Sequence, residues 1–82
     1  MLTFELTDDR SRVEVHGDRE GLLLLAQTLF DLAGKSSPDH VHLMTSEWGG
    51  SGLTSIRQGL SNGLINQVKL FIWPKQRKSE NE

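Results

Sequence analysis

Alternating apolar and polar residues at the start of the chain predict two β-strands. The alternating apolar positions are Leu2, Phe4, Leu6, Val13 and Val15. Period-two alternation is typical of a strand with one buried face. The turn sequence TDDRS separates the two runs, and the second run ends at Gly17. This spacing is typical of a hairpin, so we expect the strands to pair antiparallel and the valines to face the core.

A stripe of apolar residues at spacings of three and four predicts one amphipathic helix after the hairpin. The stripe consists of Leu22, Leu25, Ala26, Leu29, Leu32 and Ala33. Asp18 is placed to cap the helix start, because its carboxylate can accept from the free amides of the first turn. Gly34 can adopt the left-handed conformation that ends many helices. A sheet is expected to cover the stripe, with Leu25 and Leu29 facing it.

Two more strands are predicted at residues 40–44 and 68–73. In the first, Val41 and Leu43 face one way and the two histidines the other. The second alternates in the same manner and ends at Pro74, which has no amide to donate. Residues 45–65 lie between these strands and contain five glycines. They suit either a short helix or an irregular hairpin arm.

Together these elements predict a small α+β domain of order ββαββ over residues 1–74. One amphipathic helix packs on an antiparallel or mixed sheet. A chain of 82 residues buries about 60% of its unfolded surface, so the core is expected to be thin. Residues 75–82 are strongly charged, and we expect a disordered tail there.

Composition limits the chemistry of the chain. It contains no cysteine, which excludes disulfides and thiolate zinc sites. Its start, MLTFELTDDR, lacks the features of a signal peptide, and no apolar run is long enough to span a membrane, so a cytoplasmic location is expected. Residues 1–47 carry nine acids and four bases, net −5, and residues 48–82 carry two acids and five bases, net +3. The first part can face a basic partner or serve as an ordinary solubilising surface.

Three histidines are candidate metal ligands. If the valines of the hairpin and of the third strand all face the helix, then His16, His40 and His42 share the opposite face of the sheet. Three imidazoles there would suit an open zinc site. The alternatives are a half-exposed polar face and an interface that responds to pH near 6.

The outer face of the predicted sheet also carries large apolar groups. Met44, Phe71 and Trp73 lie opposite the helix-facing residues, and exposed aromatic patches usually mark contact surfaces. We therefore predict partner binding or homodimer formation there, unless the last strand is turned over. Glu47 and Trp48 precede two glycines, and Trp48 is either an anchor for a partner or a lid on the core.

Motifs for catalysis and for nucleic-acid binding are missing. The sequence has no nucleophile elbow, no helix-borne histidine pair and no phosphate-binding loop. Its one basic cluster lies in the tail and alternates with acids. We expect no enzymatic activity, no cofactor, no nucleic-acid partner and no membrane partner.

Three segments of the chain resemble the immunity protein 32 family of bacterial polymorphic toxin systems. They are VEVHGDREGLLLLAQTL, DHVHLMTSEWGGSGLT and LINQVKLFIW, within residues 12–73. The most specific parts are HVHLM and EWGG, at His40–Met44 and Glu47–Gly50. Members of this family are predicted to be encoded beside a toxin and to protect the producing cell by binding it.

The resemblance implies a stoichiometric inhibitor whose partner is a cognate toxin protein. It supplies no catalytic residue and no toxin contact. The alternative function is a small homodimeric regulatory or ligand-binding module of unknown partner.

Overall fold

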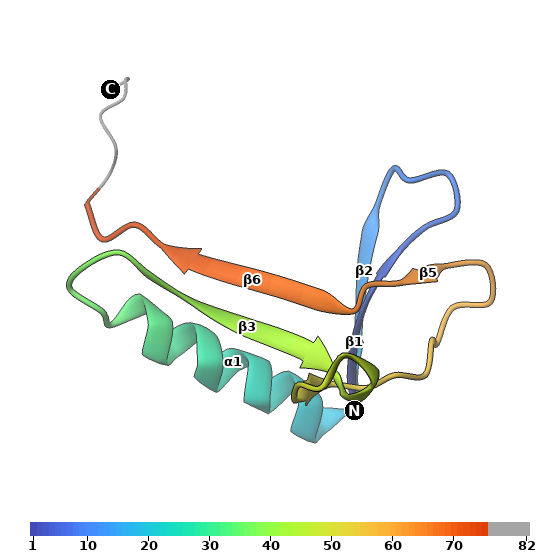
Figure 1. The fold of residues 1–82 in the computed structure, drawn as a ribbon, viewed down its shortest axis with the longest axis horizontal. Helices are drawn as coiled ribbons and strands as arrows, with labels where there is room; N and C mark the ends of the chain where they lie inside the picture. Colours follow the sequence, from blue (N-terminus) through green and yellow to red (C-terminus); the bar gives the residue numbers. More distant parts are fainter. Residues whose placement is uncertain (76–82) are drawn as a thin grey trace.

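The computed structural model describes residues 1–75 and confirms the predicted α+β class (Figure 1). The four predicted strands and the helix follow in the predicted order, with two further short strands between the third and the last. The elements are β1 (Leu2–Leu6), β2 (Val13–Gly17), α1 (Arg19–Ala33), β3 (Asp39–Thr45), the short 3₁₀ helix η1 (Ser46–Trp48), β4 (Gly52–Leu53), β5 (Gly63–Leu64) and β6 (Gln67–Ile72). From residue 76 on, the predicted tail lies outside the described residues. No helix in the described part of the chain has the length and apolar content that a membrane span requires.

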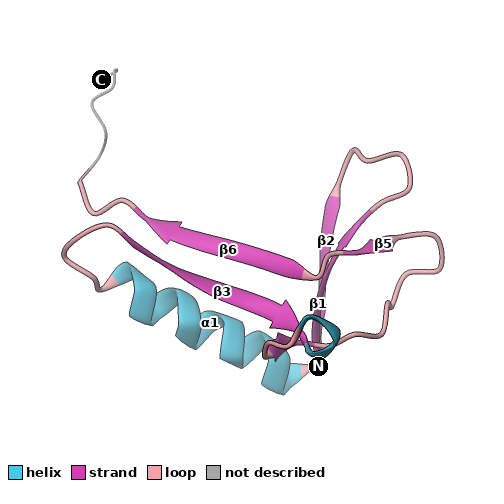
Figure 2. Cartoon of the chain, viewed as in Figure 1, coloured by secondary structure: helices cyan, strands magenta, loops and turns pink. Residues whose placement is uncertain are grey.

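The strands form two small sheets rather than the one sheet that was expected. In the first, β1 lies between β2 and β5 and is antiparallel to both. In the second, β3 lies between β4, which is parallel to it, and β6, which is antiparallel. Figure 2 shows the β1–β2 hairpin at a steep angle to the long β3–β6 pair. The helix α1 runs along this pair and contacts both of its strands, so it covers one face of the second sheet.

The arm between β3 and β6 connects the two sheets. After pairing with β3, the chain donates the Thr54 amide to the Leu2 carbonyl at 2.8 Å. After pairing with β1, it donates the Ile65 amide to the Phe4 carbonyl at 2.9 Å. No helix forms in residues 52–66. Of the two structures predicted here, the irregular arm is the one that the chain adopts.

Hydrogen bonds fix both ends of α1. The Asp18 carboxylate accepts from the Gly21 amide at 2.8 Å, as predicted, and from the terminal ammonium of Met1 at 2.7 Å. At the other end the predicted left-handed cap is wrong, because Gly34 has φ −83°. Its amide instead donates to carbonyls of the last turn, which closes the helix in the right-handed conformation.

The core lies where α1, the second sheet and the base of the hairpin meet. Its buried residues come from three different strands and are Leu2, Leu43 and Leu53. Phe4, Leu25, Val68 and Leu70 pack against them. Leu32 of α1 is also buried, but Leu29 is 45% exposed, so the sheet covers only part of the predicted stripe. A sheet with two long strands is too narrow to cover the rest.

Burial of the β1–β2 hairpin differs from the prediction in two respects, although Leu2 lies in the core as expected. Thr3 and Glu5 are 0% exposed, whereas Val13 and Val15 are 56% and 44% exposed. The expectation that these valines lie in the core is therefore wrong. The polar face of β1 is buried because the arm covers it and donates backbone amides to Glu5.

We predict that Asp18→Ala lowers the free energy of unfolding by about 1 kcal/mol, the usual cost of losing an N-cap. The variant leaves the Gly21 amide and the Met1 ammonium without their shared carboxylate. Urea denaturation followed by circular dichroism measures the effect. Asp8→Ala is the control, since it removes an exposed carboxylate of the hairpin turn. Equal stability losses in the two variants would show that the cap contributes nothing specific.

Candidate functional site

The face of the second sheet that points away from α1 carries aromatic and polar side chains. Along β6, Val68 and Leu70 pack toward the core, whereas Lys69 and Phe71 are exposed. The register places His40 directly opposite Phe71. We call this surface the aromatic face. It consists of His40, His42, Met44, Gln67, Lys69, Phe71 and Trp73.

Four rings of the aromatic face stack in a continuous row. The His40 ring centroid lies 4.9 Å from that of His42 and 5.2 Å from that of Phe71. Phe71 and Trp73 are 6.2 Å apart and nearly parallel, with 4° between their planes. Each such contact contributes about 0.5–1.5 kcal/mol, so the rings support one another in place. Phe71 and Trp73 are nevertheless 52% and 53% exposed, and the row presents them to solvent.

The turn after β3 adds Glu47 and Trp48 at one end of the aromatic face. Gly49 has φ 78°, a conformation that favours glycine, and it ends η1. A side chain at Gly50 would collide with Met44, so the loop packs closely against the aromatic face. Trp48 is 59% exposed, so it does not form a lid on the core.

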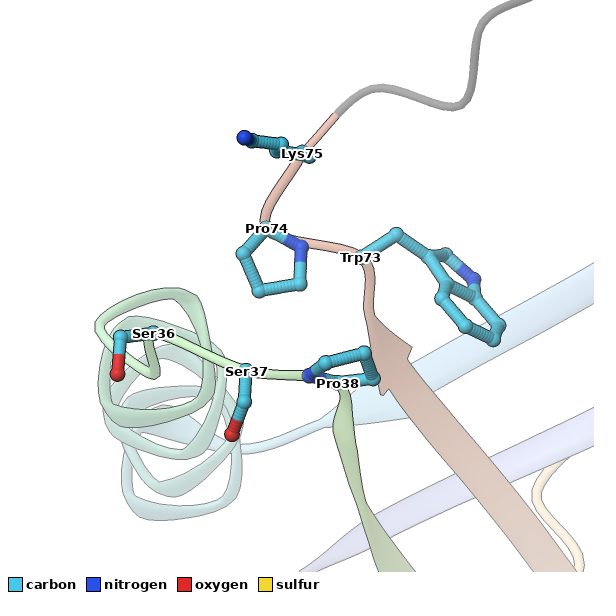
Figure 3. A pocket seen from close by; sticks show the side chains of 6 residues that line it. All are labelled: Ser36, Ser37, Pro38, Trp73, Pro74 and Lys75. Atoms are coloured by element: carbon cyan, nitrogen blue, oxygen red, sulfur yellow. The ribbon is translucent and has the colours of Figure 1, made fainter.

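A pocket of about 260 Å³ lies at the other end of the aromatic face (Figure 3). Its lining consists of Ser36, Ser37, Pro38, Trp73, Pro74 and Lys75. Figure 3 shows the rings of Pro38 and Pro74 on either side of a gap, with the Trp73 indole turned away from Pro74. Trp73 therefore belongs both to the row of rings and to the wall of this pocket.

The seven residues of the aromatic face include one lysine, Lys69, and two histidines but no carboxylate, and Glu47 follows β3. The acids of the first part of the chain lie mainly on other elements: the hairpin, the start of α1 and its polar side. They include Asp8, Asp9, Asp18, Glu20 and Asp31. The charge asymmetry of the sequence thus separates the acidic surface from the row of rings.

The structure does not bring the three histidines together. His16 lies on β2 in the first sheet, whereas His40 and His42 lie on β3 in the second. Within residues 1–75, the group of potential metal ligands that does converge is Glu5, Glu14 and His16. The His16 Nε2 atom lies 2.9 Å from Glu14 Oε1 and 3.8 Å from Glu5 Oε1.

The side chain of Asn62 closes this cluster. Its Nδ2 group donates to Glu5 Oε1 and to Glu14 Oε1, both at 2.9 Å. Glu5 Oε1 also accepts from the Gly59 amide at 2.9 Å, so its lone pairs are already used. A metal ion would have to displace the Asn62 amide. As arranged here, these residues suit a hydrogen-bonded structural cluster and do not fit a metal.

Glu5 remains ionised although it is fully buried. Burial by itself raises the pKa of this carboxyl, but hydrogen bonds from Thr3, Asn62 and the amides of Gln58 and Gly59 outweigh it and lower the pKa to about 2. The Thr3 hydroxyl donates at 2.6 Å and the Gln58 amide at 2.8 Å. One carboxylate thus holds the arm against β1.

A comparison with protein families adds independent information. The family model described as Immunity protein 32 matches residues 12–67, which is more than half of the chain. The chain belongs to the immunity protein 32 family. No curated protein and no solved structure matches it significantly.

The family match covers part of the aromatic face. His40, His42 and the turn with Trp48 lie inside the matched region. Phe71 and Trp73 lie beyond residue 67, so the match says nothing about their half of the aromatic face.

Sequence reasoning missed the Glu5 cluster. Glu5 stands between two threonines in a polar row, a pattern typical of a solvent-facing side of a strand. Thr3 is a near neighbour, but the other three donors, Gln58, Gly59 and Asn62, lie 53 to 57 positions further along the chain. No local spacing contains this information, and the single hint is the glycine-rich composition of the arm.

We predict that Glu5→Gln destabilises the protein by about 2 kcal/mol or more, because hydrogen bonds to a charged acceptor are worth roughly 1.5–3 kcal/mol each. The NH₂ group of the new side chain would also face N–H groups of Gln58, Gly59 and Asn62, with which it cannot form a hydrogen bond. Thermal and urea unfolding measure the loss. Glu47→Gln removes an exposed carboxylate and is expected to change stability by less than about 0.5 kcal/mol. If the two variants match, Glu5 does not hold the arm.

The pH dependence of stability tests the ionised state of Glu5. Its pKa is about 2 in the folded chain, below the ordinary value of 4.5, so its contribution is complete above pH 4.5 and is lost as the pH falls toward 2. The stability difference between wild type and Glu5→Gln should therefore shrink across this range. A difference that stays constant from pH 7 to pH 2 would mean that the carboxylate charge is irrelevant.

Proposed function

We propose that this protein binds and neutralises the cognate toxin of a bacterial polymorphic toxin system in the cytoplasm, and that the aromatic face is its toxin-binding surface. Membership of the immunity protein 32 family supports the first part of the proposal. The exposed row of stacked rings supports the second part, and it is the observation that carries the assignment of the surface.

Large aromatic side chains dominate the energetics of protein interfaces. Tryptophan is among the residue types most enriched at energetic hot spots, because it buries much area with few rotatable bonds. Phe71 and Trp73 are already held by neighbouring rings, so they lose little further freedom when a partner covers them. They would form the centre of the contact.

The aromatic face has the dimensions of an interface centre. A strand of six residues such as β6 extends about 20 Å, and the turn with Trp48 continues the surface past the end of β3. Polar groups at its turn end, including Gln67 and Glu47, suit a solvated rim. Met44 adds an adaptable apolar side chain beside the turn.

Acidic groups on the other elements would act at long range. The net charge of −5 in residues 1–47 can speed the approach of a basic toxin without lying in the contact itself. Inhibition of this kind requires only that the toxin be occupied. It needs neither a catalytic group nor a cofactor on the immunity protein.

The pocket next to Trp73 favours a second candidate function. A small homodimeric regulatory or ligand-binding module would use this cavity, whose lining combines ring carbons, two hydroxyls and the Lys75 ammonium. Such a module would bind no toxin. The immunity function predicts that a toxin-domain protein is encoded beside this gene. Co-expression with the product of the neighbouring gene distinguishes the two functions, since growth rescue and co-purification are expected of an immunity protein alone.

We predict that Trp73→Ala and Phe71→Ala each weaken toxin binding by about 2 kcal/mol, or roughly 30-fold in Kd. Trp48→Ala is expected to weaken it less, because Trp48 does not belong to the row of stacked rings. Calorimetric titration of the purified pair gives the Kd, and growth of cells that express the toxin gives the protection.

The matched control is Leu60→Ala, which removes a side chain that is 94% exposed on the arm. It is expected to bind and protect like wild type. If toxin binds wild type but Trp73→Ala and Phe71→Ala bind equally well, the aromatic face is the wrong surface. If wild type neither binds nor protects, the immunity function itself is wrong.

A further inference from the structure

The apolar surface of α1 is wider than the sheet beneath it. The residues of α1 that are buried or half-buried against the rest of the chain are Gly21, Leu25, Thr28 and Leu32. A second row follows the same 3–4 spacing, offset by one residue along the helix. It consists of Arg19, Leu22, Ala26, Leu29 and Ala33, all exposed. Apolar residues that repeat in this way, on average every 3.5 residues, are typical of the contact line between two packed helices.

Further apolar side chains widen this uncovered surface. Leu23 and Phe30 flank the second row and are 60% and 75% exposed. At the start of the helix, the Leu22 side chain lies against Gly17 of β2. Val15 stands two residues before Gly17 in the same strand, so its side chain projects from the same face of the hairpin. The exposed valines of the hairpin therefore continue the apolar surface of α1.

We propose that a second copy of this chain covers the second row, with the two α1 helices antiparallel across a two-fold axis at Ala26. This inference is independent of the proposed function. The aromatic face lies on the opposite side of the second sheet from α1, so a dimer of this kind leaves both aromatic faces open to toxin.

The symmetry of the row supports a second copy as the occupant. Ala26 is the midpoint of α1, since the helix runs from residue 19 to residue 33. Its methyl group allows the two helices to approach closely where they cross. Leu22 and Leu29 stand on either side of it, so an antiparallel copy brings leucine against leucine on both sides of the axis.

Charge supports the antiparallel direction. Arg19 stands in the first turn, where the helix dipole disfavours a cation, and the last turn contains no basic residue. In the antiparallel pair, Arg19 of one copy lies beside Ala33 of the other. Its guanidinium then meets the carbonyl end of the partner helix, where the dipole favours a cation.

Composition assigns the two exposed surfaces to different partners. Between Arg19 and Ala33 the second row is aliphatic, as in the permanent interfaces of homodimers. The aromatic face mixes rings with polar and titratable groups, as in interfaces between separately folded partners. The homodimer expected from the sequence is thus assigned to α1 and not to the outer face of the sheet.

Single cysteine substitutions test this arrangement, because the natural chain contains no cysteine. Ala26→Cys places two thiols at the two-fold axis. Paired thiols act at an effective concentration near millimolar. With oxidised glutathione as the oxidant and about 10 micromolar protein, we expect disulfide-linked dimers to form about a hundredfold faster than for Leu60→Cys, which depends on random collisions. Phe71→Cys is expected to behave like Leu60→Cys.

Sedimentation velocity gives a second, independent readout. Wild type is expected to be a dimer, and Ala26→Glu a folded monomer, because residue 26 is exposed in one copy and the new charges repel each other only across the axis. Leu60→Glu is expected to remain a dimer. A monomeric wild type at high concentration, or Phe71→Cys crosslinking faster than Ala26→Cys, would overturn the proposal.

Discussion

The antiparallel pairing of β3 with β6, in one register, determines both the core and the candidate site. It places Val41 opposite Leu70 on the side that α1 covers, and His40 opposite Phe71 on the side that it leaves open. A slip of one residue in β6 would exchange its two faces, sending Phe71 into the core and Leu70 to solvent. The need to bury the aliphatic side chains under α1 therefore also fixes the row of rings on the outside.

A thin core leaves much of the remaining stability to polar contacts. The arm is held against β1 by the Glu5 carboxylate, which is buried at low cost because every donor around it is aimed at its oxygens. Apolar residues that would otherwise serve this core stay exposed on α1 and on the hairpin. In a chain of this size, a second subunit is one of the usual ways to cover such a surface.

Local patterns in the sequence were sufficient for the helix and for the four longer strands, but not for β4 and β5. Strict alternation in β6 left two orientations, and the structure adopts the one with Phe71 outward. Local patterns failed where distant segments decide the outcome. Val15 was expected in the core but is exposed. The polar face of β1 is buried instead, because the arm, more than fifty positions away in the sequence, covers it. Leu29 was expected under the sheet, but periodicity gives the direction of a helical face and not the width of the sheet that covers it. The expectation that the three histidines share one face failed for a similar reason, because it assumed that all strands form a single sheet.

Binding of toxin through the aromatic face can be followed most directly at the two tryptophans of the chain. Trp73 belongs to this face and Trp48 lies in the turn beside it, and both side chains are more than half exposed. Fluorine NMR of the protein labelled with 5-fluorotryptophan gives one resonance for each. On addition of the unlabelled cognate toxin, we expect the Trp73 resonance to shift and to lose its sensitivity to solvent, with a smaller change at Trp48. Saturating toxin that leaves both resonances unchanged would contradict the assignment of this face.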